Sequence, residues 1–455
     1  MTEFPQTLPV RSGVNDIQWP AICAPVGASM LALQFQLQQS EWWPAEQLLD
    51  QQLRQLQQLL KHAVIESLWY QQQPLFHSLA KQTEPLSLNQ FAQLPCLSRA
   101  QLQQNTGTIS AANIPAAHGQ RLELATSGST GTPLLGSETE LNHFFWGGYN
   151  LRDHLWHRRD LTKKFAAIRT NVTQQTLPNW GSAISCAFDT GPAVTLNIAT
   201  PINQQLDWLI EEQPSYLLTH ASNLQALAQL SLKTGRSINS LQTVISFGER
   251  LPANLHQLCN QAWNSPLEDI YSAEEVGYIA LQCPQQPGNY HQMSEQLLVE
   301  ILNDNDEPCQ PGEWGKVVIT TLHNFAMPLI RYEIGDFARV GEPCGCGRGL
   351  PTLTEILGRT RNLITLPDGN RHWPSFPADL WLSVAPIKQF QLEQVSRNQI
   401  IAHYMMTQPL SQQQEKSLKN KLARSLLFDA NIDFQHHLEP LTKADEKFED
   451  FISRI

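Results

Sequence analysis

The sequence predicts an α/β protein that has a large N-terminal domain and a small α+β domain at its C-terminal end. Between residues 120 and 250, short apolar runs alternate with helical stretches, which is typical of buried strands covered by helices. Residues 1–110 are rich in glutamine and carry leucines three or four positions apart, as amphipathic helices do. After residue 358, three strand-like runs and one helical stretch form the small domain.

Each element is expected from its own pattern of apolar residues. Strands of the large domain are expected at residues 165–169, 193–197, 216–219 and 243–247, followed by a strand pair at 315–321 and 329–332. Helices are expected at residues 48–70 and 221–232. In the small domain, we expect strands at 387–395, 400–405 and 431–438 and a helix at 411–427. This order indicates a large multi-layer α/β domain followed by a small α+β domain.

The composition is that of an ordinary globular protein, with 41% hydrophobic and 16% charged residues among 455. The net charge of −11 disfavours binding to nucleic acid, because such binding depends on Lys and Arg contacts with phosphates. We expect neither a membrane protein nor a secreted one, since the sequence has no long apolar run and no signal-peptide pattern. The expected location is the cytoplasm, where the eight cysteines would be thiols or metal ligands.

A run of small residues between Ala125 and Pro133 is the strongest candidate for a binding site. Its glycines permit close approach of the backbone, and successive N–H groups and hydroxyls form a concave nest for an anion. It is not a Walker A loop, because Thr132 stands where that motif has lysine. Taken alone, such a run is more often a surface turn. The candidate phosphate-binding residues are Thr126, Ser127, Gly128, Ser129, Thr130 and Gly131.

Gly248 and Glu249 follow directly after the strand expected at 243–247. In open α/β sheets, ligands collect at the C-terminal ends of the strands, so these two residues are placed to line a pocket. An ordinary strand-to-loop turn explains them equally well.

One histidine and three cysteines have the chemistry of a metal site. Three thiolates and one imidazole would complete a closed tetrahedral Zn²⁺ site, which is structural because no coordination position stays open. Cys309 is the other cysteine that could enter this set. The alternative is that the late cysteine pair is simply exposed in a glycine-rich turn. The candidate zinc ligands are Cys283, His291, Cys344 and Cys346.

Several motifs in order resemble those of the adenylate-forming enzymes, and the chain looks like their phenylacetate–coenzyme A ligase-like (coenzyme F390 synthetase-like) branch. The loop at 126–131 resembles the family's phosphate-binding signature. Residues 269–277 resemble its Tyr-Gly-x-(Thr/Ser)-Glu-x-Gly element, and residues 332–336 its Tyr-x-x-Gly-Asp motif. Residues 357–364 resemble its Gly-Arg-x-Asp hinge, and Lys447 falls on the lysine of its C-terminal element. The resemblance covers residues 50 to 450.

The resemblance implies a role for each matching residue. Tyr271 would pack on adenine, and Glu275 would hold Mg²⁺ at the ATP phosphates. Asp336 would orient the ribose, and Arg359 would approach the ribose or the α-phosphate. Lys447 would reach the α-phosphate and the carboxylate during adenylation.

The same resemblance puts Gly248 and Glu249 at the edge of the adenine and acyl pockets and assigns a structural zinc to the Cys/His set. The chain departs from the family pattern at several positions. Ser272 replaces a glycine, Glu274 replaces a hydroxyl residue, and Arg361 stands where Asp or Lys is usual. Glu446 replaces the glycine before the lysine, and Asp450 stands near the expected arginine.

By this resemblance, the chain would use ATP to convert a carboxylic acid, aromatic by family analogy, to an acyl-adenylate with release of pyrophosphate. Coenzyme A is the expected acceptor, with Mg²⁺ and a structural Zn²⁺ as the metals. The expected partners are small molecules, not nucleic acid or membrane, and a homodimer is left open. The alternatives are another acceptor, namely a carrier protein, an amine or a partner reductase, or a nucleotide-binding homologue without catalysis. Residues 1–358 would form the ATP- and acyl-binding domain, mainly helical over 1–110, and residues 359–455 a mobile lid.

Overall fold

The fold is described from a computed structural model, in which residues 9–125, 135–359, 364–369, 371–372, 376, 378–426, 428–439, 441 and 451–455 are described. The chain divides into two compact units. The first comprises Met1–Ile334 and Ala338–Ile356, and the second Gly335–Phe337 and Leu357–Ile455.

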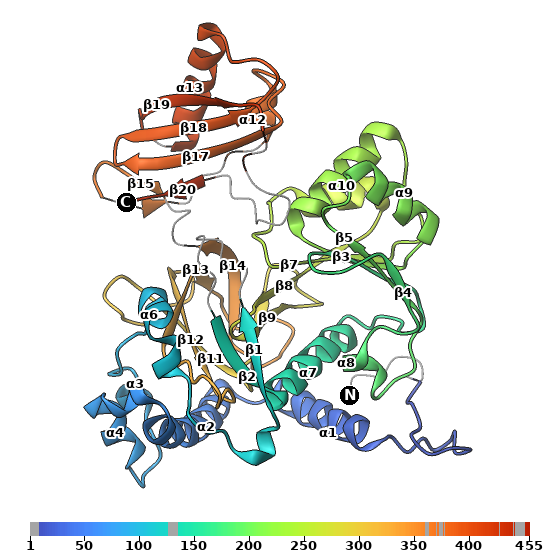
Figure 1. Cartoon of the computed structure of the whole chain (residues 1–455), viewed down its shortest axis with the longest axis vertical. Coiled ribbons are helices and arrows are strands. Elements are labelled where there is room, and N and C mark those ends of the chain that lie inside the picture. Colours follow the sequence, from blue (N-terminus) through green and yellow to red (C-terminus); the bar gives the residue numbers. More distant parts are fainter. Residues whose placement is uncertain are drawn as a thin grey trace. The chain divides into compact units, whose positions relative to one another are not determined.

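Twelve strands of the described residues form one large sheet (Figure 1). Strands β5, β3, β6, β7 and β8 run parallel to one another, and the strands predicted at 165–169, 193–197, 216–219 and 243–247 have the expected bounds. The pairs β4–β5, β8–β9, β9–β10, β10–β14 and β11–β12 are antiparallel. In spatial order the strands are β11 (Leu297–Leu302), β12 (Trp314–Thr321), β13 (Tyr332–Val340), β14 (Thr352–Arg359), β10 (Tyr290–Gln292), β9 (Gly277–Gln282), β8 (Leu267–Ala273), β7 (Thr243–Phe247), β6 (Tyr216–Thr219), β3 (Phe165–Arg169), β5 (Ala193–Asn197) and β4 (Gln175–Leu177).

Helices of the first unit cover this sheet. The helix predicted at 48–70 appears as α2 and α3, and the one predicted at 221–232 is α10. Leu53, Leu56 and Leu60 of α2 are buried in one apolar cluster together with strands of the antiparallel part, as their spacing predicted. The helices are α1 (Pro25–Ser40), α2 (Ala45–Glu66), α3 (Leu68–Gln71), α4 (Pro74–Ala80), α5 (Leu88–Phe91), α6 (Arg99–Ile109), α7 (Glu140–Trp156), α8 (Ser182–Ser185), α9 (Ile202–Glu212), α10 (Ala221–Thr234) and α11 (Leu255–Trp263), with a short 3₁₀ turn at Ala116–His118.

Both faces of the parallel strands are covered (Figure 1). Helices α9, α10 and α11 pack on one face, where Val244 of β7 and Leu209 of α9 share a buried cluster. Helices α1 and α7 pack on the other, where Ile245 of β7 and Tyr149 of α7 share a second cluster. Neighbouring residues of one strand thus point to opposite sides, which explains why the predicted strands are continuous apolar runs.

A two-stranded hairpin of β1 (Arg121–Ala125) and β2 (Leu135–Thr139) stands apart from the large sheet. The last residue of β1, Ala125, pairs with the first residue of β2, Leu135, so the phosphate-loop candidates 126–131 belong to the segment that connects the two strands. Those candidates lie outside the described residues.

The second unit is α+β, as predicted. Its main sheet has the order β19-β18-β17-β20, and the buried side chains of Trp381, Leu418 and Phe451 belong to its core. Its elements are β15 (Ile364–Thr365), β16 (Arg371–His372), α12 (Ala378–Leu382), β17 (Gln389–Ser396), β18 (Gln399–Met405), α13 (Gln412–Leu426), β19 (Asn431–His437) and β20 (Phe451–Ser453). Lys447 lies outside the described residues.

One strand prediction is wrong. Residues 329–331 are not a strand, because Arg331 adopts a φ of 51°, a left-handed conformation that interrupts an extended chain. The strand β13 begins at Tyr332 and runs to Val340, so Gly335 and Asp336 lie inside a strand instead of in the turn after one.

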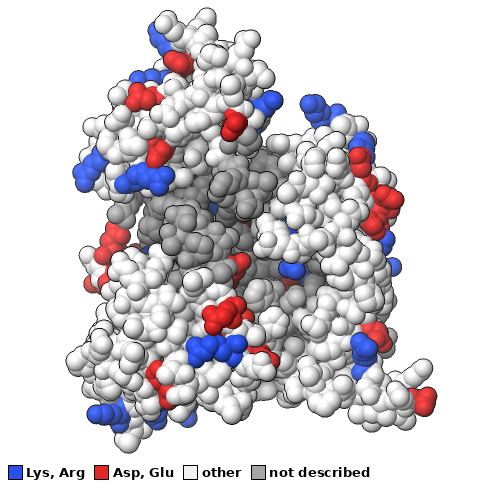
Figure 2. All heavy atoms as spheres, in the orientation of Figure 1, with Lys and Arg blue, Asp and Glu red and all other residues white. Residues whose placement is uncertain are grey.

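The surface carries mixed charge. On the face drawn in Figure 2, the described lysines and arginines occur in small groups, several of them beside acidic side chains. None of the described helices combines the length and the apolar character that crossing a membrane requires.

Candidate functional site

Two predicted site residues lie where the parallel pairing of neighbouring strands β7 and β8 ends. Phe247 of β7 pairs with Ile270 of β8, so Gly248 and Tyr271 are the next residues on adjacent strands. Gly248 has a φ of 71°, a conformation that favours glycine. The chain therefore turns sharply at the sheet edge where α/β proteins bind ligands.

Glu249, the residue after Gly248, forms a hydrogen bond with helix α10. Glu249 accepts a hydrogen bond from the backbone N–H of Ser222 over 2.8 Å, at the beginning of α10. A carboxylate suits this position, because the first N–H groups of a helix lack partners within it. Glu249 thus has a structural contact that the sequence did not predict.

Glu275 is held in the turn between β8 and β9 by two side chains from distant parts of the sequence. Its Oε1 atom accepts a hydrogen bond from Arg99 Nη1 over 3.1 Å and one from the Tyr332 hydroxyl over 3.4 Å. The residue is 7% exposed. Within the described part of the chain, no hydrogen bond or ion pair reaches its Oε2 atom. One oxygen of this buried carboxylate is therefore available to another group.

Arg99 is a site residue that the sequence analysis missed. It is the first residue of α6, directly after Ser98, whose side chain caps that helix. Its Nε and Nη2 atoms are buried and have no partner among the described residues. A guanidinium with unused donors beside Glu275 favours an anion there. A single arginine after a capping serine carries no sequence signal of such a role.

The remaining nucleotide-site candidates are described less fully. Tyr271 is buried, 8% exposed, among the apolar residues that pack on the antiparallel strands. Asp336 lies in β13, in the short stretch Gly335–Phe337 that is grouped with the second unit. Arg359 is the last residue of β14.

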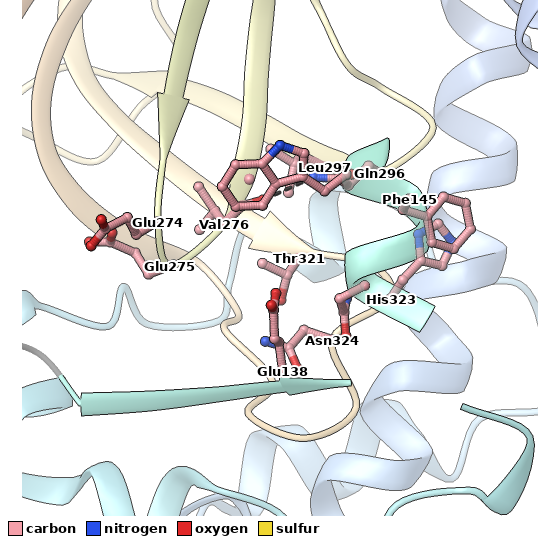
Figure 3. Close-up of a pocket in the computed structure, with 13 residues that line it drawn as sticks. Glu138, Phe145, Glu274, Glu275, Val276, Gln296, Leu297, Thr321, His323 and Asn324 are labelled. Atoms are coloured by element: carbon pink, nitrogen blue, oxygen red, sulfur yellow. Dashed lines mark hydrogen bonds between the residues drawn. The ribbon is translucent and has the colours of Figure 1, made fainter. Parts of the chain in front are cut away.

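A pocket opens in the first unit next to Glu275 (Figure 3). Together with the open solvent at its mouth, it encloses about 410 Å³ of space that no protein atom occupies. Figure 3 shows Glu274 and Glu275 at one end and Phe145 with His323 at the other. Its walls come from β2, α7, the turn before β9 and the segments at 296–297 and 321–324. The lining residues are Glu138, Asn142, Phe145, Trp146, Glu274, Glu275, Val276, Gly277, Gln296, Leu297, Thr321, His323 and Asn324.

Two polar groups of this pocket were not predicted from the sequence. His323 stacks on Phe145 with ring centroids 4.4 Å apart, and burial lowers its pKa to about 4, so the ring is neutral at pH 7. Its Nδ1 atom is buried without a partner in the described structure. Glu138 comes from β2, and burial raises the pKa of its carboxyl group.

The four predicted zinc ligands come together. The ligand atoms of Cys283, His291, Cys344 and Cys346 all lie within 4.8 Å of one another. The sulfurs of Cys344 and Cys283 are 3.7 Å apart, and Cys346 Sγ is 3.3 Å from His291 Nε2. Tetrahedral zinc with ordinary bond lengths would separate two sulfurs by about 3.8 Å and a sulfur from a nitrogen by about 3.6 Å. Cys309 is not in this group.

The histidine of this set is oriented for metal binding. His291 Nδ1 lies 3.3 Å from the backbone carbonyl oxygen of Leu350, so a proton on Nδ1 would leave Nε2 free to bind a metal. The donor set and its spacing therefore fit zinc. A second cluster, Cys96 with Asp306 and Glu333, already holds the ammonium of Lys316, 2.5 Å from Asp306 and 2.6 Å from Glu333.

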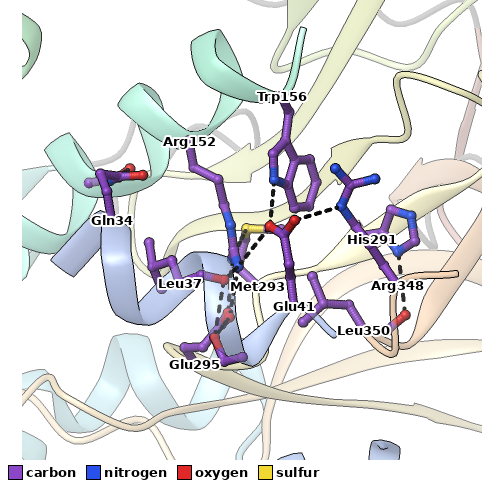
Figure 4. Close-up of polar contacts among 12 residues, drawn as sticks. Gln34, Leu37, Glu41, Arg152, Trp156, His291, Met293, Glu295, Arg348 and Leu350 are labelled. Atoms are coloured by element: carbon purple, nitrogen blue, oxygen red, sulfur yellow. Dashed lines mark hydrogen bonds and ion pairs between the residues drawn. The ribbon is translucent and has the colours of Figure 1, made fainter. Parts of the chain in front are cut away.

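A buried network of charges lies beside the Cys/His set (Figure 4). Arg152 of α7 binds Glu295 with two hydrogen bonds of 2.8 and 3.0 Å. Glu41, directly after α1, accepts a 2.7 Å hydrogen bond from the indole of Trp156 and pairs with Arg348 over 3.3 Å. The network therefore connects the segment that follows Cys346 to helices α1 and α7.

The chain is similar to several known proteins. No protein-family profile matches it. It is 28% identical over 160 residues to phenylacetate–coenzyme A ligase from Thermus thermophilus, which is 34% of this chain and 36% of that protein. It is 30% identical over 115 residues to the enzyme of the same name from Escherichia coli, which is 25% of each chain. The aligned stretches thus span about a third or less of these relatives.

The likeness in three dimensions is more extensive. A solved structure of 2-hydroxyisobutyryl-CoA ligase in its postadenylation state, in complex with 2-HIB-AMP, matches 91% of this chain and 91% of its own, with a TM-score of 0.68 and 15% sequence identity. The predicted fold is confirmed: the chain has the fold of the solved 2-hydroxyisobutyryl-CoA ligase. About a third of the chain or less is similar in sequence to phenylacetate–coenzyme A ligases, in agreement with the predicted resemblance.

Proposed function

We propose that this chain is an AMP-forming acid ligase that activates a carboxylic acid with ATP and transfers the acyl group to coenzyme A. The observation that carries the proposal is the buried Glu275 carboxylate. It lines a pocket, and its Oε2 atom has no hydrogen-bond or ion-pair partner among the residues that the structure describes. The relatives named as CoA ligases support the same activity.

The reaction would proceed in two steps. A carboxylate oxygen of the acid attacks the α-phosphorus of ATP, and pyrophosphate leaves. The thiol of coenzyme A then attacks the acyl carbonyl, and AMP leaves. Such chemistry depends on positioning and on stabilisation of developing charge. The structurally similar 2-hydroxyisobutyryl-CoA ligase has been solved with both 2-HIB-AMP and CoA, which supports coenzyme A as the acceptor here.

The residue roles in the nucleotide site remain part of the proposal. Residues 126–131 would hold the phosphates and Lys447 would neutralise charge on the α-phosphate. Tyr271 would contact adenine, Asp336 the ribose, and Arg359 the ribose or the α-phosphate. An aromatic acid is proposed on the resemblance alone.

Glu275 would hold Mg²⁺, which neutralises phosphate charge when bound. A hard cation prefers carboxylate oxygen, and ATP phosphates supply much of its remaining shell, so one free oxygen on Glu275 fits this need. Arg99, which already binds Oε1, would keep the carboxylate in place. Its unused donors would favour the phosphates nearby.

The Cys/His set would hold a structural zinc. Its four ligands leave no open position, and they join the loop after β9, strand β10 and the segment before β14. The zinc would therefore stabilise the first unit and take no part in the reaction.

A panel of carboxylic acids, assayed for pyrophosphate and AMP release with and without coenzyme A, tests the proposed function. We expect acid-dependent pyrophosphate release, with AMP release that requires coenzyme A. Release of AMP that requires a carrier protein, an amine or a reductase would identify another acceptor. Replacement Lys447→Ala should reduce acid-dependent ATP–pyrophosphate exchange by about 10²- to 10³-fold, as the loss of one charge-stabilising group does. A folded chain inactive with every acid would indicate a nucleotide-binding homologue without catalysis.

A further inference from the structure

Three side chains from separate parts of the chain form a closed set of hydrogen bonds around Glu275. Arg99 Nη1 donates to Glu275 Oε1 over 3.1 Å and to the hydroxyl oxygen of Tyr332 over 3.2 Å. The Tyr332 hydroxyl in turn donates to the same Oε1 atom over 3.4 Å. A terminal guanidinium nitrogen carries two protons, and a phenol both accepts and donates, so all three hydrogen bonds can form at once. One oxygen of Glu275 is thus held from two sides.

The backbone also brings Arg99 and Tyr332 together. Leu97 forms a parallel bridge with Tyr332. The N–H of Leu97 donates to the carbonyl oxygen of Arg331 over 2.8 Å, and its carbonyl oxygen accepts from the N–H of Glu333 over 2.9 Å. Two residues after Leu97, Arg99 begins helix α6. The guanidinium therefore extends from a backbone that is hydrogen-bonded to the beginning of β13.

These contacts orient a carboxylate that is buried. Glu275 is 7% exposed, Tyr332 is fully buried, and the side chain of Arg99 is 16% exposed. A glutamate side chain loses rotational freedom when it is ordered, and the two contacts to Oε1 offset that loss. They leave Oε2 as the oxygen to which none of the described residues donates. Partners that hold one part of a ligating side chain in this way fix the direction of the atom that binds the metal.

We propose that Arg99 and Tyr332 are positioning residues for Glu275 that act only in the first half of the reaction, the attack of the acid on ATP. The inference rests on the proposed function. With Oε1 held, Oε2 is the atom that faces Mg²⁺ at the ATP phosphates. Two of those phosphates leave as pyrophosphate before the thiol of coenzyme A attacks, so the positioning of Glu275 has no part in the second half.

The expected effect is that of losing an outer partner of a metal ligand, which typically lowers metal affinity or activity by about 10- to 100-fold. Arg99→Met removes the charged partner of Oε1. Tyr332→Phe removes one hydrogen bond of 3.4 Å and keeps the buried ring, so its effect should lie at the low end of this range. Arg99→Lys keeps a positive charge and a donor, so it should recover part of the loss.

The test measures Mg²⁺-dependent ATP binding and the two half-reactions separately. ATP is titrated calorimetrically into the full chain with and without Mg²⁺. Acid-dependent ATP–pyrophosphate exchange follows the first half-reaction, and thioester formation from a synthetic acyl-adenylate and coenzyme A follows the second. The variants are Arg99→Met, Arg99→Lys and Tyr332→Phe. The control is Arg54→Met, since Arg54 is an exposed arginine of α2 that pairs with Asp50 on the same helix. Thermal unfolding checks that every variant folds.

We expect Arg99→Met to lose about 10-fold or more of the gain in ATP affinity that Mg²⁺ gives the wild type, and to slow exchange by about 10- to 100-fold. ATP binding without Mg²⁺ and thioester formation should stay at the wild-type level in this variant. All readouts should stay there in Arg54→Met. In a Glu275→Gln background, Arg99→Met should cause no further loss of exchange, because the carboxylate that it holds is absent.

A Mg²⁺ effect on ATP binding that is equal in Arg99→Met and the wild type, or absent from both, would overturn the inference. A parallel loss in both half-reactions and in ATP binding without Mg²⁺ would also overturn it, because such a loss indicates a purely structural role. Absence of exchange with every acid, together with a Mg²⁺ effect that falls in Arg99→Met, would count against the proposed function alone.

Discussion

The Cys/His set permits a sharp prediction about metal content. Replacement Cys346→Ser removes one of four ligands, whose sulfur lies 3.3 Å from His291 Nε2. Three ligands then remain, and water fills the fourth position of the zinc. Zinc prefers a soft thiolate to water at that position, so the loss of the thiolate weakens zinc binding. We therefore expect the wild type to hold one zinc per chain and Cys346→Ser to lose it to a chelator that leaves the wild type loaded.

The loss of zinc should also lower stability. At free zinc 100 times above its Kd, binding to the folded state stabilises it by about 2.7 kcal/mol. For a unit of this size, each kcal/mol shifts the unfolding midpoint by about 2 °C, so the variant should melt about 5 °C lower. The shift should vanish when the two proteins are compared after complete removal of zinc.

Metal analysis by mass spectrometry and thermal unfolding with and without chelator measure both effects. The control is Cys309→Ser, since Cys309 is outside the set and its thiol donates to the backbone carbonyl of Trp314. It should keep zinc and melt like the wild type. Full zinc content in Cys346→Ser, or equal loss from Cys309→Ser, would refute the assignment of these ligands.

Two further predictions concern buried charge. Replacement Arg152→Met removes the ion-pair partner of Glu295 in the interior and should lower the free energy of unfolding by about 3–5 kcal/mol in denaturant titrations. Arg152→Met combined with Glu295→Gln should recover part of this loss. Equal stability of the single variant and the wild type would contradict the prediction. Burial lowers the pKa of His154 to about 3, so between about pH 6.5 and 3 the unfolded chain binds a proton that the folded chain does not. As the pH decreases through this range, His154 should lower the free energy of unfolding by at most about 1.4 kcal/mol per pH unit. His154→Gln should flatten that part of the pH profile, and an unchanged slope would show that other groups cause it.

Much of the fold was predictable because it follows from local patterns. The strands at 165–169 and 243–247 are continuous apolar runs, and the structure explains this by helices on both faces. The strand predicted at 329–332 was wrong over residues 329–331. Arg331 adopts a left-handed conformation there, and its side chain donates to the carbonyl groups of Ala92 and Leu94, contacts that no local pattern records.

The candidate site was predictable only in part. Cys283 and Cys346 could be grouped in advance because three thiols and one imidazole complete a zinc site and because the resembled family carries a zinc in the same segments. Arg99, Glu138 and His323 are single polar residues far from one another in the sequence, and only folding brings them to the pocket or to Glu275. Arg99 and His323 stand out because buried nitrogen atoms of their side chains have no partner among the described residues, which a sequence cannot reveal.

The central claim is that Glu275 holds the Mg²⁺ that ATP-dependent activation of the acid requires. The most direct measurement is acid-dependent ATP–pyrophosphate exchange in Mg²⁺ for the wild type, Glu275→Gln and the neighbouring exposed Glu274→Gln. We predict exchange in the wild type and in Glu274→Gln, and a loss of at least about 10²-fold in Glu275→Gln that added Mg²⁺ partly restores. Exchange in Glu275→Gln at the wild-type rate would contradict the account.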